Sequence, residues 1–167
     1  MQEFIDNSDG KDKQDCEINA SKRWVDNFNN QTEKKLIMLG DDLYSREPMI
    51  QNILDKKHSY IFVAKPTSHK YLYEQIEMVR NLGTLDTKKQ EKIVHGKKQI
   101  TTYSYINDVM IKSSQGKKVQ SLTTNWCEVI VTNVNGKKLY HNCFITNIPL
   151  HANNVADIIQ AGRTRWK

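Results

Sequence analysis

Asp41 and Asp42 are the residues whose types and position are best suited to chemistry. They follow the apolar run Leu36-Ile37-Met38-Leu39 and Gly40, and such a run is typical of a short strand buried on both faces of a parallel sheet. Ligands of open α/β sheets collect beyond the carboxyl ends of strands, where carboxylates can bind a divalent cation. The alternative is a turn or capping role, which is the commoner one for aspartate between a strand and a helix.

A helix should follow these two carboxylates. Ser45 is placed as its N-cap and Pro48 in its first turn, where a missing N–H costs little, and the sequence then puts apolar side chains at helical spacing up to Leu54. A second apolar run occupies residues 60–64. Residues 35–65 therefore predict a strand, a crossover helix and a parallel strand with a right-handed connection.

Two more helices are expected around this unit. Residues 12–28 repeat apolar side chains every four positions, with Trp24 on the face that should lie on the sheet. Ser68 is a candidate cap for a helix that ends near Leu82-Gly83. Residues 1–11 are polar and are expected to be irregular.

The period changes to that of β-structure over roughly residues 88–147. Residues 100–106 alternate after a turn at Gly96, residues 113–118 are expected to form a flexible loop, and Asn135-Gly136 is a strong hairpin signal. A closing helix follows, with Asn153 as its cap and an apolar stripe from Val155 to Trp166. The expected organisation is an α/β core in residues 1–66, a helix with a β-rich basic insertion in 67–150, and the start of the closing helix in 151–167.

The composition limits the class of protein. At 167 residues and 19.5 kDa the chain suits one domain. It has no apolar run near the roughly 20 residues of a membrane span and no signal-peptide layout, so a cytoplasmic location is expected. Three widely spaced cysteines without a CxxC pair, and five histidines without HExxH, argue against a disulfide framework and a structural zinc site.

Positive charge is concentrated in residues 80–118. The chain carries a net charge of +6, and this segment holds nine basic side chains against three acidic ones. Tyr103 and Tyr105 are interleaved with the lysines, a pattern that favours binding to a nucleic-acid backbone. The alternative is a solvated lysine-rich surface. The basic residues are Arg80, Lys88, Lys89, Lys92, Lys97, Lys98, Lys112, Lys117 and Lys118.

Three stretches in this order resemble a bacterial insertion-sequence transposase of the DDE type. They are residues 9–17, residues 40–48 (Gly-Asp-Asp-Leu-Tyr-Ser-Arg-Glu-Pro) and residues 163–167 (Arg-Thr-Arg-Trp-Lys). The resemblance implies a partial ribonuclease-H-like core with an antiparallel β-rich insertion. It also implies Mg²⁺-dependent hydrolysis and strand transfer at transposon ends, in which two ions held by three carboxylates activate water and then a 3′-hydroxyl. No small-molecule cofactor is implied.

The family motif assigns roles to residues of this sequence. An aromatic three residues after the second acid makes Asp41, with Tyr44, the match for that acid, and Asp42 is the neighbouring candidate metal ligand. Arg165, before the pair Trp166-Lys167, matches the family arginine that contacts DNA, whereas Gly162 stands where the family has a tyrosine. The residues expected to contact DNA are Arg163, Arg165, Lys167, Lys97, Lys98, Lys117 and Lys118.

The first acid and the final glutamate of the family have no counterpart in this sequence. The chain is therefore expected to be an internal fragment that does not cleave DNA, because a single carboxylate competes poorly with water for Mg²⁺. An open sheet edge should make copies of it associate, as a homodimer or as larger species. Alternatives are a non-catalytic, DNA-binding regulatory remnant, an unrelated receiver-like α/β protein, and a relic without function.

Overall fold

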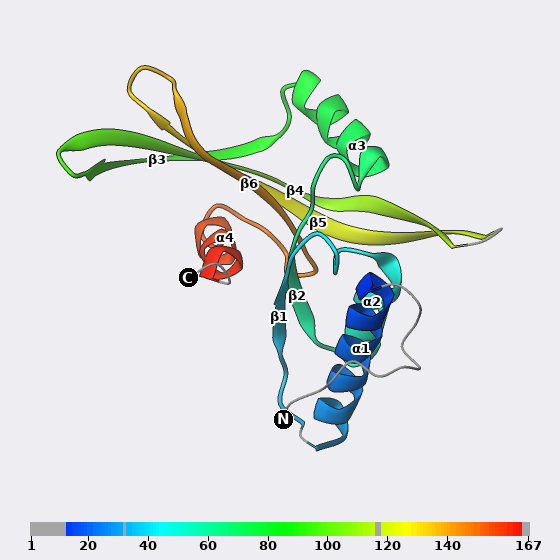
Figure 1. Ribbon diagram of the computed structural model, residues 1–167. Helices are drawn as coiled ribbons and strands as arrows, with labels where there is room; N and C mark the ends of the chain where they lie inside the picture. The colour runs from blue at the N-terminus through cyan, green and yellow to red at the C-terminus, as the bar shows by residue number, and fades with distance from the viewer. Residues whose placement is uncertain (1–12, 32, 116–117, 165–167) are drawn as a thin grey trace.

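The computed structural model describes residues 13–31, 33–115 and 118–164, which form four helices and one mixed sheet of six strands (Figure 1). The order of strands across the sheet is β1-β2-β6-β5-β4-β3. The predicted α/β class is confirmed. The helices are α1 (Lys13–Gln31), α2 (Glu47–Asp55), α3 (Lys70–Asn81) and α4 (Val155–Thr164), and the strands are β1 (Ile37–Gly40), β2 (Ser59–Val63), β3 (Asp86–Val94), β4 (Lys97–Gln115), β5 (Lys118–Asn133) and β6 (Lys138–Thr146).

The strand, helix and parallel strand predicted for residues 35–65 are confirmed as β1, α2 and β2. The two strands pair in parallel from Ile37 opposite Ser59 to Gly40 opposite Phe62. The apolar face of α2 is fully buried, which holds the crossover helix against the sheet. The buried face consists of Met49, Ile50 and Ile53.

The β-rich block continues the same sheet, because β6 pairs antiparallel with β2 between Ile61 opposite Thr146 and Val63 opposite Phe144. Strands from both sides of the division suggested between residues 66 and 67 therefore belong to one sheet. Both predicted hairpins are present, with positive φ at His95, Gly96 and Gly136. Positive φ is the backbone conformation that tight hairpin turns require.

The flexible loop predicted for residues 113–118 is wrong for residues 113–115 and 118, which lie in strands, and residues 116–117 lie outside the described residues. Strand β4 continues to Gln115 and β5 begins at Lys118, with Ser113 opposite Gln120 and Ser114 opposite Val119. Glycine and lysine are depleted from strands, but strand propensity depends on context, and cross-strand backbone pairing outweighs it in this long hairpin.

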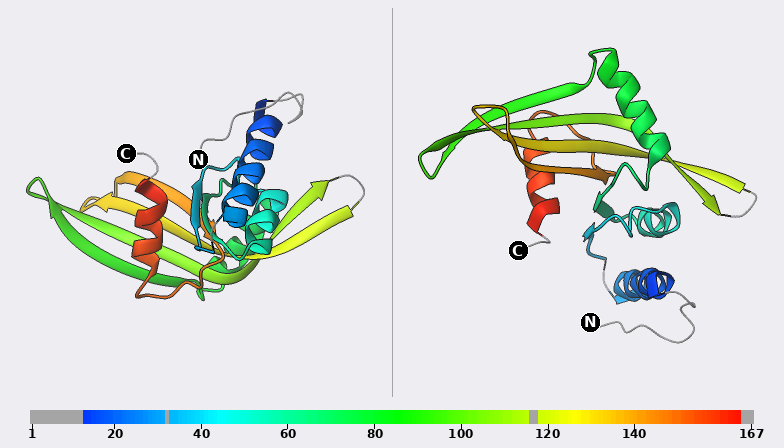
Figure 2. Two further views of the ribbon diagram at one scale, coloured as in Figure 1. Left: turned by 90° about the horizontal axis from the view of Figure 1, so that it is seen from below. Right: turned by 45° about the horizontal axis from the view of Figure 1, so that its top comes forward.

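Helices cover both faces of the sheet (Figure 2). On one face, α1, α2 and α3 pack over a core that includes Val25, Ile53, Ile76 and Trp126, and Trp24 packs against it as predicted. On the other face, α4 closes a second core. The second core includes Ile61, Cys127, Val129, Phe144, Val155 and Ile159.

The predicted helix caps are wrong by one residue. The N-cap of α2 is Arg46 and that of α3 is His69, and neither caps through its side chain. The hydroxyl of Ser45 donates to the carbonyl of Asp42, and that of Ser68 donates to the Asp42 carboxylate. Ahead of α4, the amide side chain that organises the turn belongs to Asn154, which accepts from the N–H of His151, and not to Asn153. The hydroxyls of Ser45 and Ser68 therefore bind Asp42 instead of capping helices.

Gly162 allows the last turn of α4 to approach the sheet closely. A Cβ at this position would lie 2.7 Å from Cε1 of Phe144 and 3.0 Å from Cγ2 of Ile61. Trp166, assigned to the apolar stripe of this helix, lies outside the described residues. Among the described residues, no helix is long and apolar enough to cross a membrane.

Gly162→Ala should lower the free energy of unfolding by up to about 2 kcal/mol, although alanine is intrinsically the better helix former by about 1 kcal/mol. Overpacking against the Phe144 ring costs about 1–3 kcal/mol and outweighs that preference. Urea unfolding measures the difference. Gln160→Ala, at an exposed position of the same helix, should change stability by less than about 0.5 kcal/mol, and a Gly162→Ala variant more stable than the parent would contradict the close packing.

The two edge strands differ in how they are protected. At one edge, β1 exposes 56% of Ile37 and 36% of Leu39. At the other edge, β3 carries several lysines, and charged side chains discourage edge-to-edge pairing. The β1 edge is thus the more apolar and the less protected of the two.

Ile37→Lys should therefore reduce self-association of the chain, because a lysine on the β1 edge opposes the addition of another strand. Sedimentation velocity across a concentration series measures the effect. Ile93→Lys is the matched control, since Ile93 is also exposed but lies on the lysine-rich β3 edge. Equal effects of the two substitutions would argue against the β1 edge as the site of association.

Candidate functional site

The loop that follows β1 is shaped by Asp41. Its Oδ1 accepts a hydrogen bond from the N–H of Leu43 at 3.0 Å, and its carbonyl accepts one from the N–H of Tyr44 at 3.1 Å. These bonds form a tight turn at the carboxyl end of β1. The predicted position of Asp41, at the end of a strand beside a parallel neighbour, is confirmed by the strand pairing.

Asp42 links this turn to the loop that follows β2. Its Oδ1 accepts from the N–H of Lys65 at 2.7 Å, and its Oδ2 accepts from the hydroxyl of Ser68. Nε2 of His69 lies 3.8 Å from Oδ1 and 2.7 Å from the hydroxyl of Ser45. Both Asp42 oxygens thus accept hydrogen bonds that fasten this turn to the loop after β2.

His69 is kept neutral by its surroundings. Burial lowers the pKa of its imidazole, the Asp42 carboxylate opposes this, and the guanidinium of Arg46 adds to it. The net direction is downward. A neutral ring that donates from Nε2 to the Ser45 hydroxyl fits this pattern, so the Ser45–His69–Asp42 group is a structural hydrogen-bond network.

Tyr44, the aromatic of the predicted motif, is held by helix α1. Its hydroxyl donates to Oε1 of Glu17 at 2.6 Å. Burial and this hydrogen bond to a carboxylate raise the pKa of Tyr44. Glu17 thus approaches the end of β1 through Tyr44, a placement that sequence reasoning missed because it depends on how α1 docks.

The basic residue of the closing helix lies over an aromatic ring. The guanidinium carbon of Arg163 is 4.2 Å from the ring centroid of Tyr140 on β6. Both side chains line an open groove of about 700 Å³ between α4 and the β3–β6 strands. Its other lining residues include Lys92, Val94, Tyr103, Val131 and Gln160.

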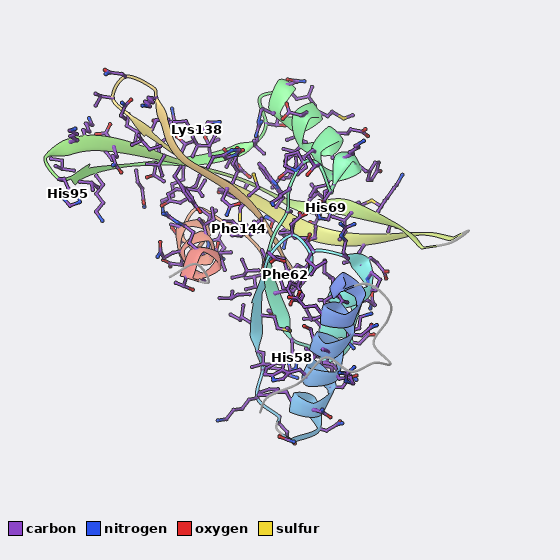
Figure 3. The ribbon with its side chains drawn as sticks, viewed as in Figure 1. His58, Phe62, His69, His95, Lys138 and Phe144 are labelled. Carbon is purple, nitrogen blue, oxygen red and sulfur yellow. The ribbon has the colours of Figure 1, made fainter. Side chains whose placement is uncertain are left out.

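The other residues predicted to contact DNA lie at the β3–β4 turn, at the start of β5 or outside the described residues. Lys97 and Lys98 are exposed beside the β3–β4 turn, whose tip is marked by His95 in Figure 3, and Lys98 Nζ lies 2.7 Å from Oε2 of Glu91. Lys118 is described only as part of the β5 backbone. Arg165, Lys167 and Lys117 lie outside the described residues.

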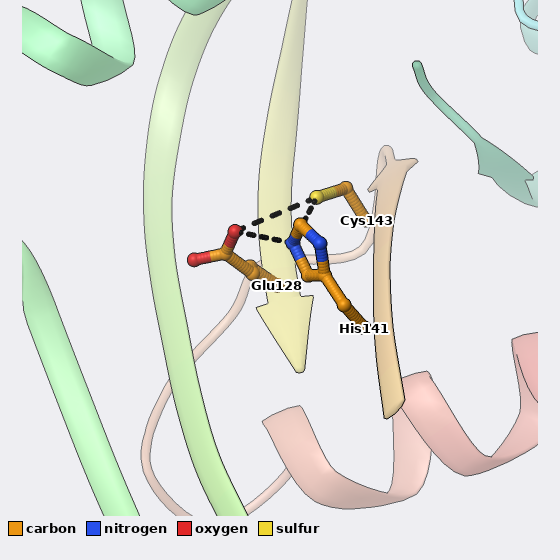
Figure 4. A group of neighbouring side chains, drawn as sticks. All are labelled: Glu128, His141 and Cys143. Carbon is orange, nitrogen blue, oxygen red and sulfur yellow. Dashed lines mark hydrogen bonds and ion pairs between the residues drawn. The ribbon is translucent and has the colours of Figure 1, made fainter. Parts of the chain in front are cut away.

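A third group of polar side chains was not anticipated from the sequence. Glu128 on β5 and His141 and Cys143 on β6 converge on the face of the sheet that α3 covers (Figure 4). Nε2 of His141 lies 2.7 Å from Oε1 of Glu128 and 3.6 Å from Sγ of Cys143, and Sγ lies 3.7 Å from the same carboxylate oxygen. Arg80 of α3 donates to the other oxygen, Oε2, at 3.0 Å.

This group is not a nucleophilic triad. A relay needs the two ring nitrogens of a histidine to serve the nucleophile and the acid separately, whereas here one nitrogen, Nε2, faces both Cys143 and Glu128. Burial also raises the pKa of the Cys143 thiol to about 12, which removes the thiolate that nucleophilic catalysis requires.

Comparison with protein-family models and with curated proteins gives no match to this chain.

Asp42→Ala should lower the free energy of unfolding by about 2–4 kcal/mol, because it removes charge-assisted hydrogen bonds and leaves the N–H of Lys65 without its acceptor. Thermal and urea unfolding followed by circular dichroism would measure the loss. Asp86→Ala, at the exposed start of β3, should cost less than about 0.5 kcal/mol. Equal, small effects would mean that Asp42 does not fasten the two loops.

Proposed function

We propose that this chain is the central part of the catalytic region of a DDE-type DNA transposase, with a partial ribonuclease-H-like core and Asp41 as the second acid. One observation carries the proposal. The parallel β1–α2–β2 unit has Asp41 at the end of β1, and the last turn of α4 packs on the opposite face of the same two strands.

The position of that last turn follows from the strand register. Gly162 lies against Ile61, and Ile61 is opposite Leu39 in β1, two residues before Asp41. The closing helix therefore crosses the sheet beside the strand that bears the acid. This arrangement supports assignment to the transposase family, in which the final helix supplies groups to the end of the sheet that bears the acids.

The position of Arg163 on Tyr140 also supports the proposal. Phe144 is opposite Val63 at the carboxyl end of β2, and β6 runs antiparallel to β2. Tyr140, four residues earlier in β6, therefore lies beyond that carboxyl end, and Arg163 stacks on it. Asp41, which follows β1, and Arg163 of α4 thus both lie toward the carboxyl ends of the parallel strands β1 and β2.

Asp41 is the proposed Mg²⁺ ligand because it directly follows β1 and stands three residues before Tyr44, as the family motif requires. Asp42 instead accepts hydrogen bonds from Lys65 and Ser68 in the loop after β2. In the family, the bound ions supply the activation of water and of a 3′-hydroxyl. With one matching acid in the sequence, the chain by itself is not expected to hold two ions.

The groove beside α4 is the surface best suited to DNA. It combines the cations of Lys92 and Arg163 with the rings of Tyr103 and Tyr140, and such a combination binds phosphates and stacks on bases. Glu91 also lines the groove, and its carboxylate is paired with Lys98. The exposed apolar edge of β1 also supports the proposal, because a ribonuclease-H-like sheet places further strands there.

Arg163→Gln should weaken binding to duplex DNA and make the slope of log K against log salt concentration shallower by about 1, as expected for one lost phosphate contact. Fluorescence anisotropy with a labelled duplex at several salt concentrations provides the measurement. Lys56→Gln is the control, since Lys56 pairs with Asp26 on the α1–α2 side of the sheet. An affinity that does not change with salt would remove DNA binding from the proposal.

A non-catalytic, DNA-binding regulatory role is the second candidate. It is favoured by the fact that neither Asp41 nor Asp42 is among the described residues that line the groove, so binding there needs no catalytic centre. The two candidate functions are distinguished by expressing the chain together with any coding sequence that flanks it and assaying Mg²⁺-dependent nicking of DNA. Loss of nicking in Asp41→Asn supports the transposase, and binding without nicking supports the regulatory role.

A further inference from the structure

We propose that Glu128, His141 and Cys143 form a binding site for a zinc ion. The site is independent of the proposed transposase chemistry, because it lies on the α3 face of the sheet and uses none of the residues at the end of β1. The three donor atoms come from neighbouring strands that the β5–β6 pairing holds in fixed register.

Strand geometry explains why the three side chains meet. Glu128 and Cys143 are directly opposite each other in the β5–β6 ladder, and opposite residues share a face of the sheet. His141 lies two residues from Cys143 in β6, and side chains two apart share a face. The backbone of a rigid sheet therefore presents a carboxylate, an imidazole and a thiol to one point.

The distances between the donor atoms match a tetrahedral zinc centre. Zinc bonds of about 2.0 Å to nitrogen and oxygen and 2.3 Å to sulfur place the sulfur roughly 3.6 Å from each of the other donors, and nitrogen roughly 3.3 Å from oxygen. Sγ lies 3.6 Å from Nε2 of His141 and 3.7 Å from Oε1 of Glu128. The pair Nε2–Oε1, at 2.7 Å, is a hydrogen bond that would lengthen by roughly 0.6 Å as the metal replaces the proton.

The ligand types select the metal. A cysteine thiolate and an imidazole are ligands for zinc and other transition ions, whereas Mg²⁺ and Ca²⁺ prefer oxygen. Binding releases the thiol proton of Cys143 to solvent as the zinc–sulfur bond forms, so no oxidant or reductant is required.

The surroundings complete such a centre. Arg80 holds Oε2 of Glu128, which leaves Oε1 directed at the other two donors and fixes the orientation of the carboxylate, as outer partners of metal ligands do. Cys143 and Glu128 are buried, while His141 is 38% exposed. Solvent can therefore reach the site from the His141 side and supply a water as the fourth ligand.

The test is titration of the purified chain with Co²⁺ and then Zn²⁺, in the presence of a reductant that does not chelate metals. About one equivalent of Co²⁺ should produce a thiolate-to-cobalt charge-transfer absorption, which Zn²⁺ then abolishes. His141→Gln should weaken Zn²⁺ binding by roughly 100-fold or more, because losing an outer partner alone costs about 10–100-fold. Cys143→Ala should lose the absorption band.

Matched controls separate this site from general surface binding. His151→Gln and His95→Gln each remove another exposed histidine, so both variants should bind as the parent does. Cooperative unfolding of each variant shows that it is folded. The proposal is overturned if the parent chain gives no charge-transfer band, if folded His141→Gln binds as tightly as the parent, or if a control substitution abolishes binding.

Discussion

The pairing of β2 on both of its sides is the constraint on which the rest of the structure depends. Parallel pairing with β1 and antiparallel pairing with β6 join the α/β unit and the β-rich block into one sheet. Helices cover both faces, so residues 60–63 are all buried, with Tyr60 and Phe62 toward α2 and Ile61 and Val63 toward α4. A strand in this position must be apolar at every residue, since neither face meets water.

Polar side chains from distant parts of the chain fasten both ends of β2. Past its carboxyl end, Asp42 accepts from the N–H of Lys65. At its amino end, Asn147 accepts from the N–H of Tyr60 and donates to the carbonyl of His58. Figure 3 shows His58 and His69 near these two ends. Backbone groups that the ladders leave unpaired are thereby satisfied, as buried polar groups require.

Alternation along β6 separates the two surfaces to which we assign binding. Tyr140 faces α4, and Arg163 stacks on its ring in the groove. The next residue, His141, faces the side covered by α3 and is hydrogen-bonded to Glu128. The groove lined by Arg163 and Tyr140 and the Glu128–His141–Cys143 cluster therefore lie on opposite faces of one sheet. Ligand binding at one need not obstruct the other, although both depend on the same β5–β6 register.

The sequence by itself determined the local elements: the apolar runs of β1 and β2, the helical spacing of α2, and the turns at Gly96 and Asn135-Gly136. It also placed Asp41 at a strand end, because periodicity and turn chemistry are properties of neighbouring residues. Tertiary structure alone decided that Ser45 and Ser68 serve the Asp42 network instead of capping helices, and that residues 113–115 continue a strand. It alone brought Glu128 beside His141 and Cys143, because strand register sets contacts between residues far apart in the chain, and spacing along one segment carries no record of it.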